Sequence, residues 1–228
     1  MSRVRGVILD VDGTLVDSND AHARAWVDAM TEAGYIAPYE IVRPLIGMGG
    51  DNLLPAAIGV GKNSDEGQLL DERRAQIFKA RYLPELRGFE GVPALLERLK
   101  QDGVRLVVAS SAKADELEHL LKIAQAADYI DAQTAADNVD ESKPEPDIVQ
   151  AALDKLGMHP SETVMLGDTP YDVEAAGRAG VPIIGLRSGG WRDDRLEGAV
   201  AIYDDPADLL DHYDESPLAN AAPRSVLA

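Results

Sequence analysis

Five short runs, apolar on both faces of an extended chain, constrain the fold of this sequence more than any other feature. They are Val4–Asp10, Arg105–Ser110, Thr163–Gly167, Pro182–Leu186 and Ala199–Tyr203. Segments with helical spacing lie between them, namely Val92–Gln101, Glu145–Leu156 and Pro170–Ala179. Buried strands that alternate with helices are typical of a parallel sheet covered by helices on both sides. We therefore predict an α/β fold with a Rossmann-like parallel sheet core.

The alternation breaks between the first two runs. From Asn19 to Pro84 no segment resembles a strand, and helical patterns cover Asn19–Ala33, Tyr39–Ile46, Asp51–Ile58 and Asp65–Tyr82. About 65 residues are too many for an ordinary crossover, so we predict an inserted α-helical cap domain at residues 19–84. The repeated amphipathic pattern disfavours the alternative, a decorative loop. Residues 1–18 and 85–213 would form the catalytic core, and residues 214–228 a flexible C-terminal tail.

Composition excludes several classes of protein. The 228 residues carry a net charge of −18, from 40 acidic and 22 basic side chains. This balance argues against nucleic acid and anionic membranes as partners, because both require clustered cations. The chain has no cysteine, which excludes disulfides, thiolate metal sites and thiol nucleophiles. It has no apolar run of about 20 residues and enters a strand almost at once, so we expect a cytoplasmic protein without a signal peptide.

Polar residues follow the apolar runs at the end where ligands bind in parallel sheets. Asp10, Asp12, Gly13 and Thr14 end the first run, Ser110 and Ser111 the second, Asp168 the third, with Asp172 one turn later and Lys143 in the segment ESKPEP. Clustered carboxylates repel one another, and burial increases the cost, so they need a cation. Oxygen ligands without His or Cys favour a hard ion, Mg²⁺ first. We predict that Asp10, Asp12, Asp168 and Asp172 bind it.

The positions also suggest chemical roles. Asp10, at the tip of a rigid strand, can attack phosphorus as a covalent nucleophile. Asp12 can protonate the leaving oxygen and later deprotonate water. Ser110 can donate a hydrogen bond to a phosphoryl oxygen, and Lys143 can neutralise the nucleophile and the transferred group. Gly13, Thr14 and Ser111 are further candidates for binding the phosphate.

Each of these residues also has an ordinary structural interpretation. Asp12 with the glycine that follows it could form a turn, and the two serines could cap a helix. Lys143 alone would usually be a solvated surface lysine, and Asp168 could be a helix N-cap. The turn is less favoured because Asp10 also ends a buried strand, and the place of Lys143 in SKPEP favours a functional role. For the serines the two interpretations are compatible, and for Asp168 both stay open.

Four of these segments together resemble a known family. The motif DVDGT, the serine that closes LVVAS, the lysine of SKPEP and the motif GDTPYD are similar to the four ordered motifs of the haloacid dehalogenase superfamily, over about residues 4 to 190. The resemblance implies Mg²⁺-dependent phosphoryl transfer through an aspartyl-phosphate. It also implies that the Asp10 side chain and the Asp12 backbone carbonyl bind the metal. The dehalogenating branch lacks the second aspartate, so Asp12 favours phosphate chemistry.

The predicted cap bears on the substrate. His22 matches a cap histidine of β-phosphoglucomutase-like relatives, although it could be a surface histidine. The segment GMGGD, which contains Gly49 and Gly50, resembles the substrate-specificity loop of such caps. The mutases carry there an arginine for a second phosphate, and this chain has Gly50 instead. Lys62 or another cap residue could replace that arginine.

We therefore expect a phosphatase that acts on a small phosphomonoester and resembles phosphoglycolate or sugar phosphatases. A β-phosphoglucomutase-like phosphosugar mutase is the alternative enzyme. The non-enzymatic alternatives are a phospho-aspartate receiver-like module, which the chain length and the predicted cap disfavour, and an inactive binding protein. We expect a small phosphorylated molecule as partner, and a monomer or weak dimer.

Overall fold

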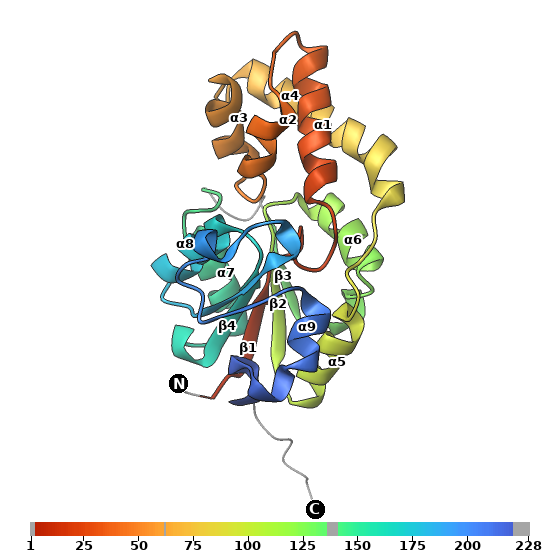
Figure 1. Cartoon of the computed structure of the whole chain (residues 1–228). Helices are drawn as coiled ribbons and strands as arrows, with labels where there is room; N and C mark the ends of the chain where they lie inside the picture. Colours follow the sequence, from red (N-terminus) through yellow and green to blue (C-terminus); the bar gives the residue numbers. More distant parts are fainter. Residues whose placement is uncertain (1–2, 62, 136–140, 221–228) are drawn as a thin grey trace, which may run out of the picture.

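The computed structural model describes residues 3–61, 63–135 and 141–220, and its centre is a six-stranded parallel sheet (Figure 1). The strands are β1 (Gly6–Leu9), β2 (Arg105–Ala109), β3 (Ala132–Thr134), β4 (Thr163–Gly167), β5 (Ile183–Leu186) and β6 (Ala201–Tyr203). Their order is β3-β2-β1-β4-β5-β6, with β1 hydrogen-bonded to both β2 and β4. This architecture confirms the predicted α/β class.

The sequence predicted five of the six strands and missed β3. That strand contains only Ala132, Gln133 and Thr134, and it pairs with β2 at one edge of the sheet. Three residues, of which two are polar, are too few to produce a hydrophobic pattern, because hydrogen bonding to a neighbouring strand defines this edge.

Helices cover both faces of the sheet, and the alternation of side chains along β1 divides the core between them. Val7 and Leu9 belong to the apolar cluster on one face, and Ile8 belongs to the cluster on the other. The first face carries α5 (Val92–Gln101), α6 (Ala114–Ile123) and α9 (Pro206–Asp211), and the second α7 (Asp147–Leu156) and α8 (Pro170–Arg178) (Figure 1). No helix was predicted at α6, although the leucines of this helix are buried against the sheet.

The part of the chain between β1 and α5 is helical and stands over one end of the sheet (Figure 1). Its helices are α1 (Asn19–Glu32), α2 (Tyr39–Val42), α3 (Gly50–Ile58) and α4 (Asp65–Ile77). Two predicted helices change geometry before their expected ends. After α2 the chain continues as a 3₁₀ turn that contains Pro44, which has no N–H to extend an α-helix, and α4 continues as a π-helical turn, Phe78–Tyr82.

The helical insertion has an apolar core of its own and is also packed on the main one. Trp26 and Met30 of α1 are buried in a cluster made only of insertion residues. Ala25 and Ala29, on an adjacent face of the same helix, join Phe78 in the main sheet cluster. The start and the end of the insertion are therefore fixed to the sheet domain, while its outer helices pack against one another.

The last described residues are more ordered than the sequence suggested. Tyr213–Glu215 and Pro217–Asn220 form 3₁₀ turns, and Leu218 is fully buried in the main cluster. Packed structure therefore continues beyond residue 213, where the predicted tail begins, and residues 221–228 lie outside the described part of the chain. Among the described helices, none has the length and apolar character needed to cross a bilayer.

Candidate active site

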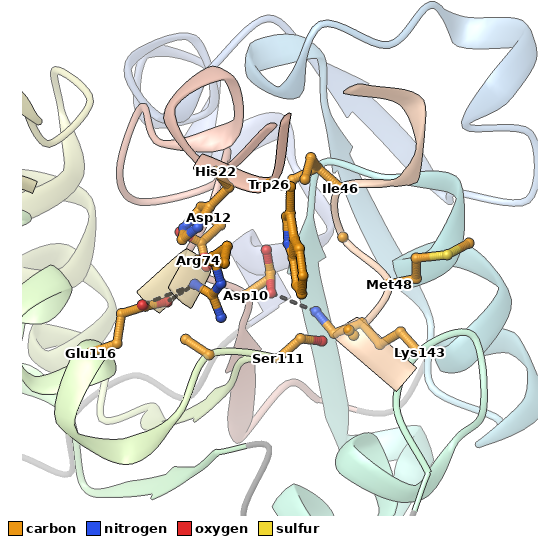
Figure 2. A pocket seen from close by; sticks show the side chains of 14 residues that line it. Asp10, Asp12, His22, Trp26, Ile46, Met48, Arg74, Ser111, Glu116 and Lys143 are labelled. Carbon is orange, nitrogen blue, oxygen red and sulfur yellow. Dashed lines mark hydrogen bonds and ion pairs between the residues drawn. The ribbon is translucent and has the colours of Figure 1, made fainter. Parts of the chain in front are cut away.

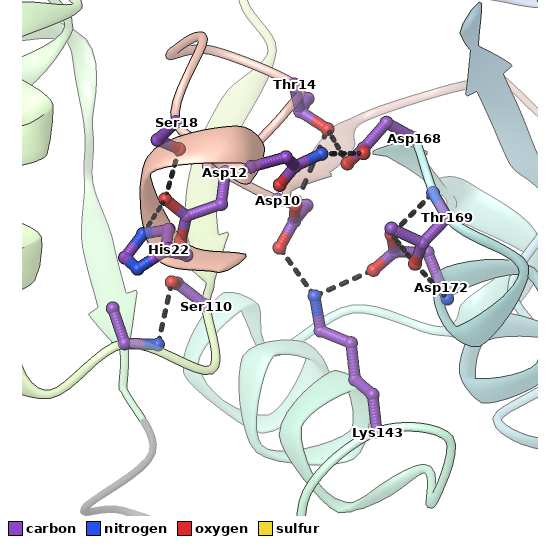
Figure 3. A network of polar contacts seen from close by, with 12 residues as sticks. Asp10, Asp12, Thr14, Ser18, His22, Ser110, Lys143, Asp168, Thr169 and Asp172 are labelled. Atoms are coloured by element: carbon purple, nitrogen blue, oxygen red, sulfur yellow. Dashed lines mark hydrogen bonds and ion pairs between the residues drawn. The ribbon is translucent and has the colours of Figure 1, made fainter. Parts of the chain in front are cut away.

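A buried lysine joins two aspartates at the carboxyl end of the sheet (Figure 3). Lys143 Nζ donates to Asp10 Oδ1 at 2.5 Å and to Asp172 Oδ1 at 2.7 Å. Only 1% of Lys143 is exposed, so its interpretation as a solvated surface lysine is wrong. Burial alone would lower the pKa of Lys143, but the neighbouring carboxylates of Asp10 and Asp172 raise it above its usual value. The lysine is therefore a fixed positive charge beside Asp10.

Three buried carboxylates form the centre of this site. Asp10, Asp168 and Asp172 each offer an oxygen within 4.8 Å of the others. Burial raises the pKa of Asp10 to about 7, although Lys143 opposes the shift. Burial, and then the charges of Asp10 and Asp172, also raise the pKa of Asp168. One lysine does not offset three carboxylates, so this cluster has the composition and the charge deficit of a site that can hold a metal ion.

Two neutral side chains orient Asp168. Thr14 Oγ1 donates to Asp168 Oδ1 at 3.0 Å, and Asn19 Nδ2 donates to Asp168 Oδ2 at 2.8 Å. Gly13 allows this close approach, because a Cβ built on it would lie 2.2 Å from both the Asn19 amide and Asp168, and its φ is +78°. Gly13 and Thr14, predicted as phosphate ligands, thus contribute to the placement of Asp168. The contact from Asn19 was not predicted, because nothing in the local pattern around Asn19 indicates it.

Asp172 has both of its oxygens engaged. Oδ1 accepts from Lys143, and Oδ2 accepts from the backbone N–H of Thr169 at 3.0 Å and from its hydroxyl at 2.6 Å. Thr169 and Asp172 form a capping box at the start of α8, so the N-cap is Thr169 and not Asp168, contrary to the alternative considered above. The first turn of α8 consequently fixes where Asp172 meets Lys143.

Asp12 lies at the pocket beside Asp10 and faces the first helix of the insertion (Figure 3). Its Oδ1 accepts from the Ser18 hydroxyl at 2.5 Å and contacts His22 Nε2 at 2.8 Å. Burial opposes ionisation of Asp12, but the charge and hydrogen bond of His22 and the Ser18 hydroxyl outweigh it and lower its pKa. His22 is 7% exposed and stacks on the Phe78 ring at 4.0 Å. The alternative interpretation of His22 as a surface residue is therefore wrong.

The two serines after β2 have different surroundings. Ser110 is fully buried, and its hydroxyl accepts a hydrogen bond from the Ala112 N–H at 3.1 Å. Ser111 lines the pocket, and its buried hydroxyl has no hydrogen-bond partner within the described residues. Ser111 therefore presents the free hydroxyl to the pocket, while Ser110 shapes the turn beneath it.

A small cavity, of about 60 Å³, lies between the sheet edge and the insertion (Figure 2). The core contributes Asp10, Asp12, Ser111, Ala112, Glu116 and Lys143, and the insertion contributes His22, Trp26, Arg74 and the segment from Ile46 to Gly50. The glycines of that segment allow close packing. A Cβ on Gly49 would lie 2.1 Å from Ser142 Oγ, and one on Gly50 would lie 3.2 Å from the Trp26 ring.

Sequence reasoning missed Arg74 and Glu116 at this cavity. Arg74 is 8% exposed, and its Nη1 donates to both carboxylate oxygens of Glu116, at 3.2 and 3.0 Å. Arg74 sits in the polar run DERRAQ, which has no apolar stripe to indicate the buried face. Lys62, considered as a cationic residue of the cap, lies outside the described residues.

The fold and the site together define a parallel α/β enzyme whose carboxylate-rich centre is enclosed by a helical insertion. The chain belongs to the haloacid dehalogenase-like hydrolase family, whose family model matches residues 7–186. This match spans β1 to β5 and therefore includes every core residue of the site.

Curated and solved relatives agree with this membership. The chain is 34% identical over 217 residues to a phosphoglycolate phosphatase of Rhodospirillum rubrum, with 91% of this chain and 90% of that protein covered. It resembles the crystal structure of a hydrolase from Pseudomonas syringae with a TM-score of 0.85 and 32% identity, over 92% and 98% of the two chains. It also resembles CbbY from Rhodobacter sphaeroides in complex with phosphate, with a TM-score of 0.76 and 26% identity over 90% and 96%.

Proposed function

We propose that this protein is a Mg²⁺-dependent phosphatase that hydrolyses a small phosphomonoester through an aspartyl-phosphate on Asp10. The observation that carries the proposal is the buried contact of Lys143 with Asp10 and Asp172 at the floor of a cavity. The lysine favours the anionic form of Asp10 against the effect of burial and offsets negative charge on an incoming phosphoryl group. Membership of a hydrolase family and the phosphatase relatives support the same reaction.

The proposed reaction uses Asp10 and Asp12 in two steps. In the first, a carboxylate oxygen of Asp10 attacks phosphorus, the bond from phosphorus to the ester oxygen breaks, and Asp12 gives that oxygen a proton. In the second, Asp12 takes a proton from water, which attacks the phosphorus and releases inorganic phosphate from Asp10. The contact of Asp12 with His22 supports this assignment, because His22 is positioned to influence when Asp12 holds the proton.

The acidic cluster fits Mg²⁺ as the resident metal. Asp10 and Asp168 would hold it, with the Asp12 backbone carbonyl, and Asp172 would lie nearby to orient Lys143. When bound, the ion would supply positive charge beside the transferred phosphoryl group. Thr14 and Asn19 hold the Asp168 carboxylate in place through its two oxygens. Burial and like charge raise the pKa values of Asp10 and Asp168, which supports a site that requires a cation.

The helical insertion, which we propose is a cap domain at residues 19–84, would enclose the substrate and exclude bulk water. The small cavity and the relative named phosphoglycolate phosphatase favour 2-phosphoglycolate as the first substrate to test. The protein's proposed partners include no nucleic acid or membrane. We also propose that it is a cytoplasmic monomer or weak dimer, which sedimentation of the purified protein would test.

Phosphate release from a panel of phosphomonoesters, with Mg²⁺ and with a chelator, tests the proposal. We expect metal-dependent release and, after acid quenching, a phosphorylated peptide that contains Asp10. Phosphate release without that peptide would contradict the covalent route. Conversion of β-glucose 1-phosphate to glucose 6-phosphate, with little free phosphate, would identify a mutase instead.

A further inference from the structure

The cavity has a second buried cation, on the side opposite the sheet. Arg74 of α4 lines the cavity that Asp10 and Lys143 also line, and its side chain points toward the centre of the cavity (Figure 2). Its guanidinium lies over the ring of Trp26, 5.3 Å from the ring centroid. A charged group is rarely more than nine-tenths buried unless it is paired, so the partners of Arg74 decide what it can still bind.

Those partners occupy only part of the guanidinium. Nη1 donates to both oxygens of Glu116, and Nη2 makes a long contact of 3.5 Å with Asp71 Oδ1. The buried Nε has no hydrogen-bond partner within the described residues. An arginine has five N–H donors in a planar fork, and the edge formed by Nε and Nη2 matches the two oxygens of a carboxylate.

The charges around Arg74 are already balanced by Lys113 and two carboxylates, so its remaining capacity for a ligand lies in its hydrogen-bond donors. Lys113 Nζ lies 2.7 Å from Asp71 Oδ2 and offsets that carboxylate. Glu116 is on α6 of the sheet domain and Arg74 is on the insertion, so the pair forms across the cavity wall. The positive charges of the cavity are thus placed on two sides, with Lys143 at the site of phosphoryl transfer and Arg74 beyond it.

From this arrangement, and resting on the phosphatase function proposed above, we propose that Arg74 determines specificity by binding a carboxylate on the substrate. Glu116 holds the Nη1 end of the guanidinium, and the edge formed by Nε and Nη2 receives the substrate carboxylate. The substrate class is then a short phosphorylated carboxylic acid. A neutral amide at the same place offers only one acceptor oxygen and turns its NH2 group toward the second N–H of the edge, so one donor stays unpaired, and such an unpaired polar group gives a site its selectivity.

Two nearly isosteric substrates test this role. We would compare kcat/KM for 2-phosphoglycolate and for its neutral amide, with p-nitrophenyl phosphate as a reference. The original protein should prefer the acid by about 100-fold, and Arg74→Met, which keeps an apolar stem against Trp26, should abolish most of that preference. The loss of preference should appear as a higher KM for the acid, while kcat/KM for the amide changes by less than about 3-fold.

Two further variants separate recognition from side effects. Arg74→Met leaves Glu116 unpaired, which by itself could repel an acid, so the double variant Arg74→Met with Glu116→Gln should also lack the preference. Arg73→Gln is the matched control, since Arg73 is adjacent on α4 but pairs with Glu32 on the outside. It should retain the full preference.

Binding gives a readout that does not depend on turnover. In the Asp10→Asn protein, calorimetry should show that Arg74→Met weakens 2-phosphoglycolate binding by about 30-fold or more, with little change for the amide. Equal loss for acid and amide, or no preference in the original protein, would overturn the role of Arg74. Absence of phosphate release from all three esters would instead overturn the phosphatase function, and the binding comparison would still decide the role of Arg74.

Discussion

The sheet side and the cap side of the cavity are built differently. On the sheet side, Asp10, Lys143 and Asp168 are buried within one continuous hydrogen-bond network that begins at strand ends. On the cap side, Trp26 and Arg74 project from helices, and the guanidinium Nε has no hydrogen-bond partner in the described part of the chain. The difference suggests that the sheet fixes the chemistry while the cap selects the substrate. Substitutions on the two sides would separate these contributions.

The strongest test on the sheet side is a substitution of the proposed nucleophile, Asp10. Asp10→Asn should lower phosphate release by about 10⁴-fold or more, because an amide cannot form the covalent intermediate. The protein should still fold, because burial already disfavours the ionised form of Asp10 and asparagine carries no charge. Activity assays with circular dichroism melts would check both points, and Asp65→Asn, at an exposed site on α4, is the control. Retained turnover in Asp10→Asn would place the chemistry elsewhere.

Substitution of Lys143 should lower both the activity and the free energy of unfolding, a combination that we do not expect for residues of the cap. Lys143→Met would leave Asp10 and Asp172 buried without their shared partner. We expect activity to fall by about 10³-fold and the free energy of unfolding to fall by about 3–5 kcal/mol. Urea denaturation measures the second effect, with Lys122→Met on the exposed side of α6 as the control. Unchanged stability would mean that the carboxylates are neutral without the lysine.

Metal removal tests the charge deficit of the acidic cluster. Saturating Mg²⁺ should raise the free energy of unfolding by about 2–3 kcal/mol at 100 times its dissociation constant. In the presence of a chelator, Asp168→Asn should melt above the original protein, because it removes a charge that burial and its neighbours disfavour. The same variant should lose the response to Mg²⁺. A full response to the ion in Asp168→Asn would exclude Asp168 as a ligand.

His22 tests a residue that the cap contributes to the chemistry itself. His22→Asn removes the ring that contacts Asp12 and stacks on Phe78. If the ring governs proton donation by Asp12, turnover of an alkyl phosphate should fall by about 10- to 100-fold. Turnover of p-nitrophenyl phosphate should fall less, because its leaving group needs little protonation. Equal losses for the two esters would indicate that His22 acts only on structure.

The smallest effect is expected where the cap contacts the loop that carries the lysine. Asn52 Nδ2 donates to the backbone carbonyl of Lys143 at 3.2 Å. Asn52→Ala should remove this hydrogen bond, at a cost of about 1 kcal/mol. It should raise KM by a few-fold and leave the stability of the sheet domain nearly unchanged. Steady-state kinetics and a thermal melt would measure the two quantities. A large fall in kcat would show that the cap also positions Lys143.

Most of the sheet and its acidic edge could be predicted from the sequence. Burial on both faces leaves a continuous apolar run such as Thr163–Gly167, whose predicted bounds match the strand. Asp10, Asp168 and Lys143 could be placed at one edge because parallel strands present their carboxyl ends together. The same reasoning missed β3, because a short edge strand with polar residues has no such signature.

The class of fold, the helical insertion and the identity of the acids and the lysine could be predicted from the chain alone, because local patterns of burial and spacing encode them. The details of each contact came from the folded structure. In the structure Arg74 lies beside Glu116, Asn19 beside Asp168 and His22 beside Asp12. The Ser111 hydroxyl has no hydrogen-bond partner among the described residues. Such contacts depend on how one element packs on another. Neither the charges nor the periodicity of a polar helix indicates which of its residues will be buried in that packing.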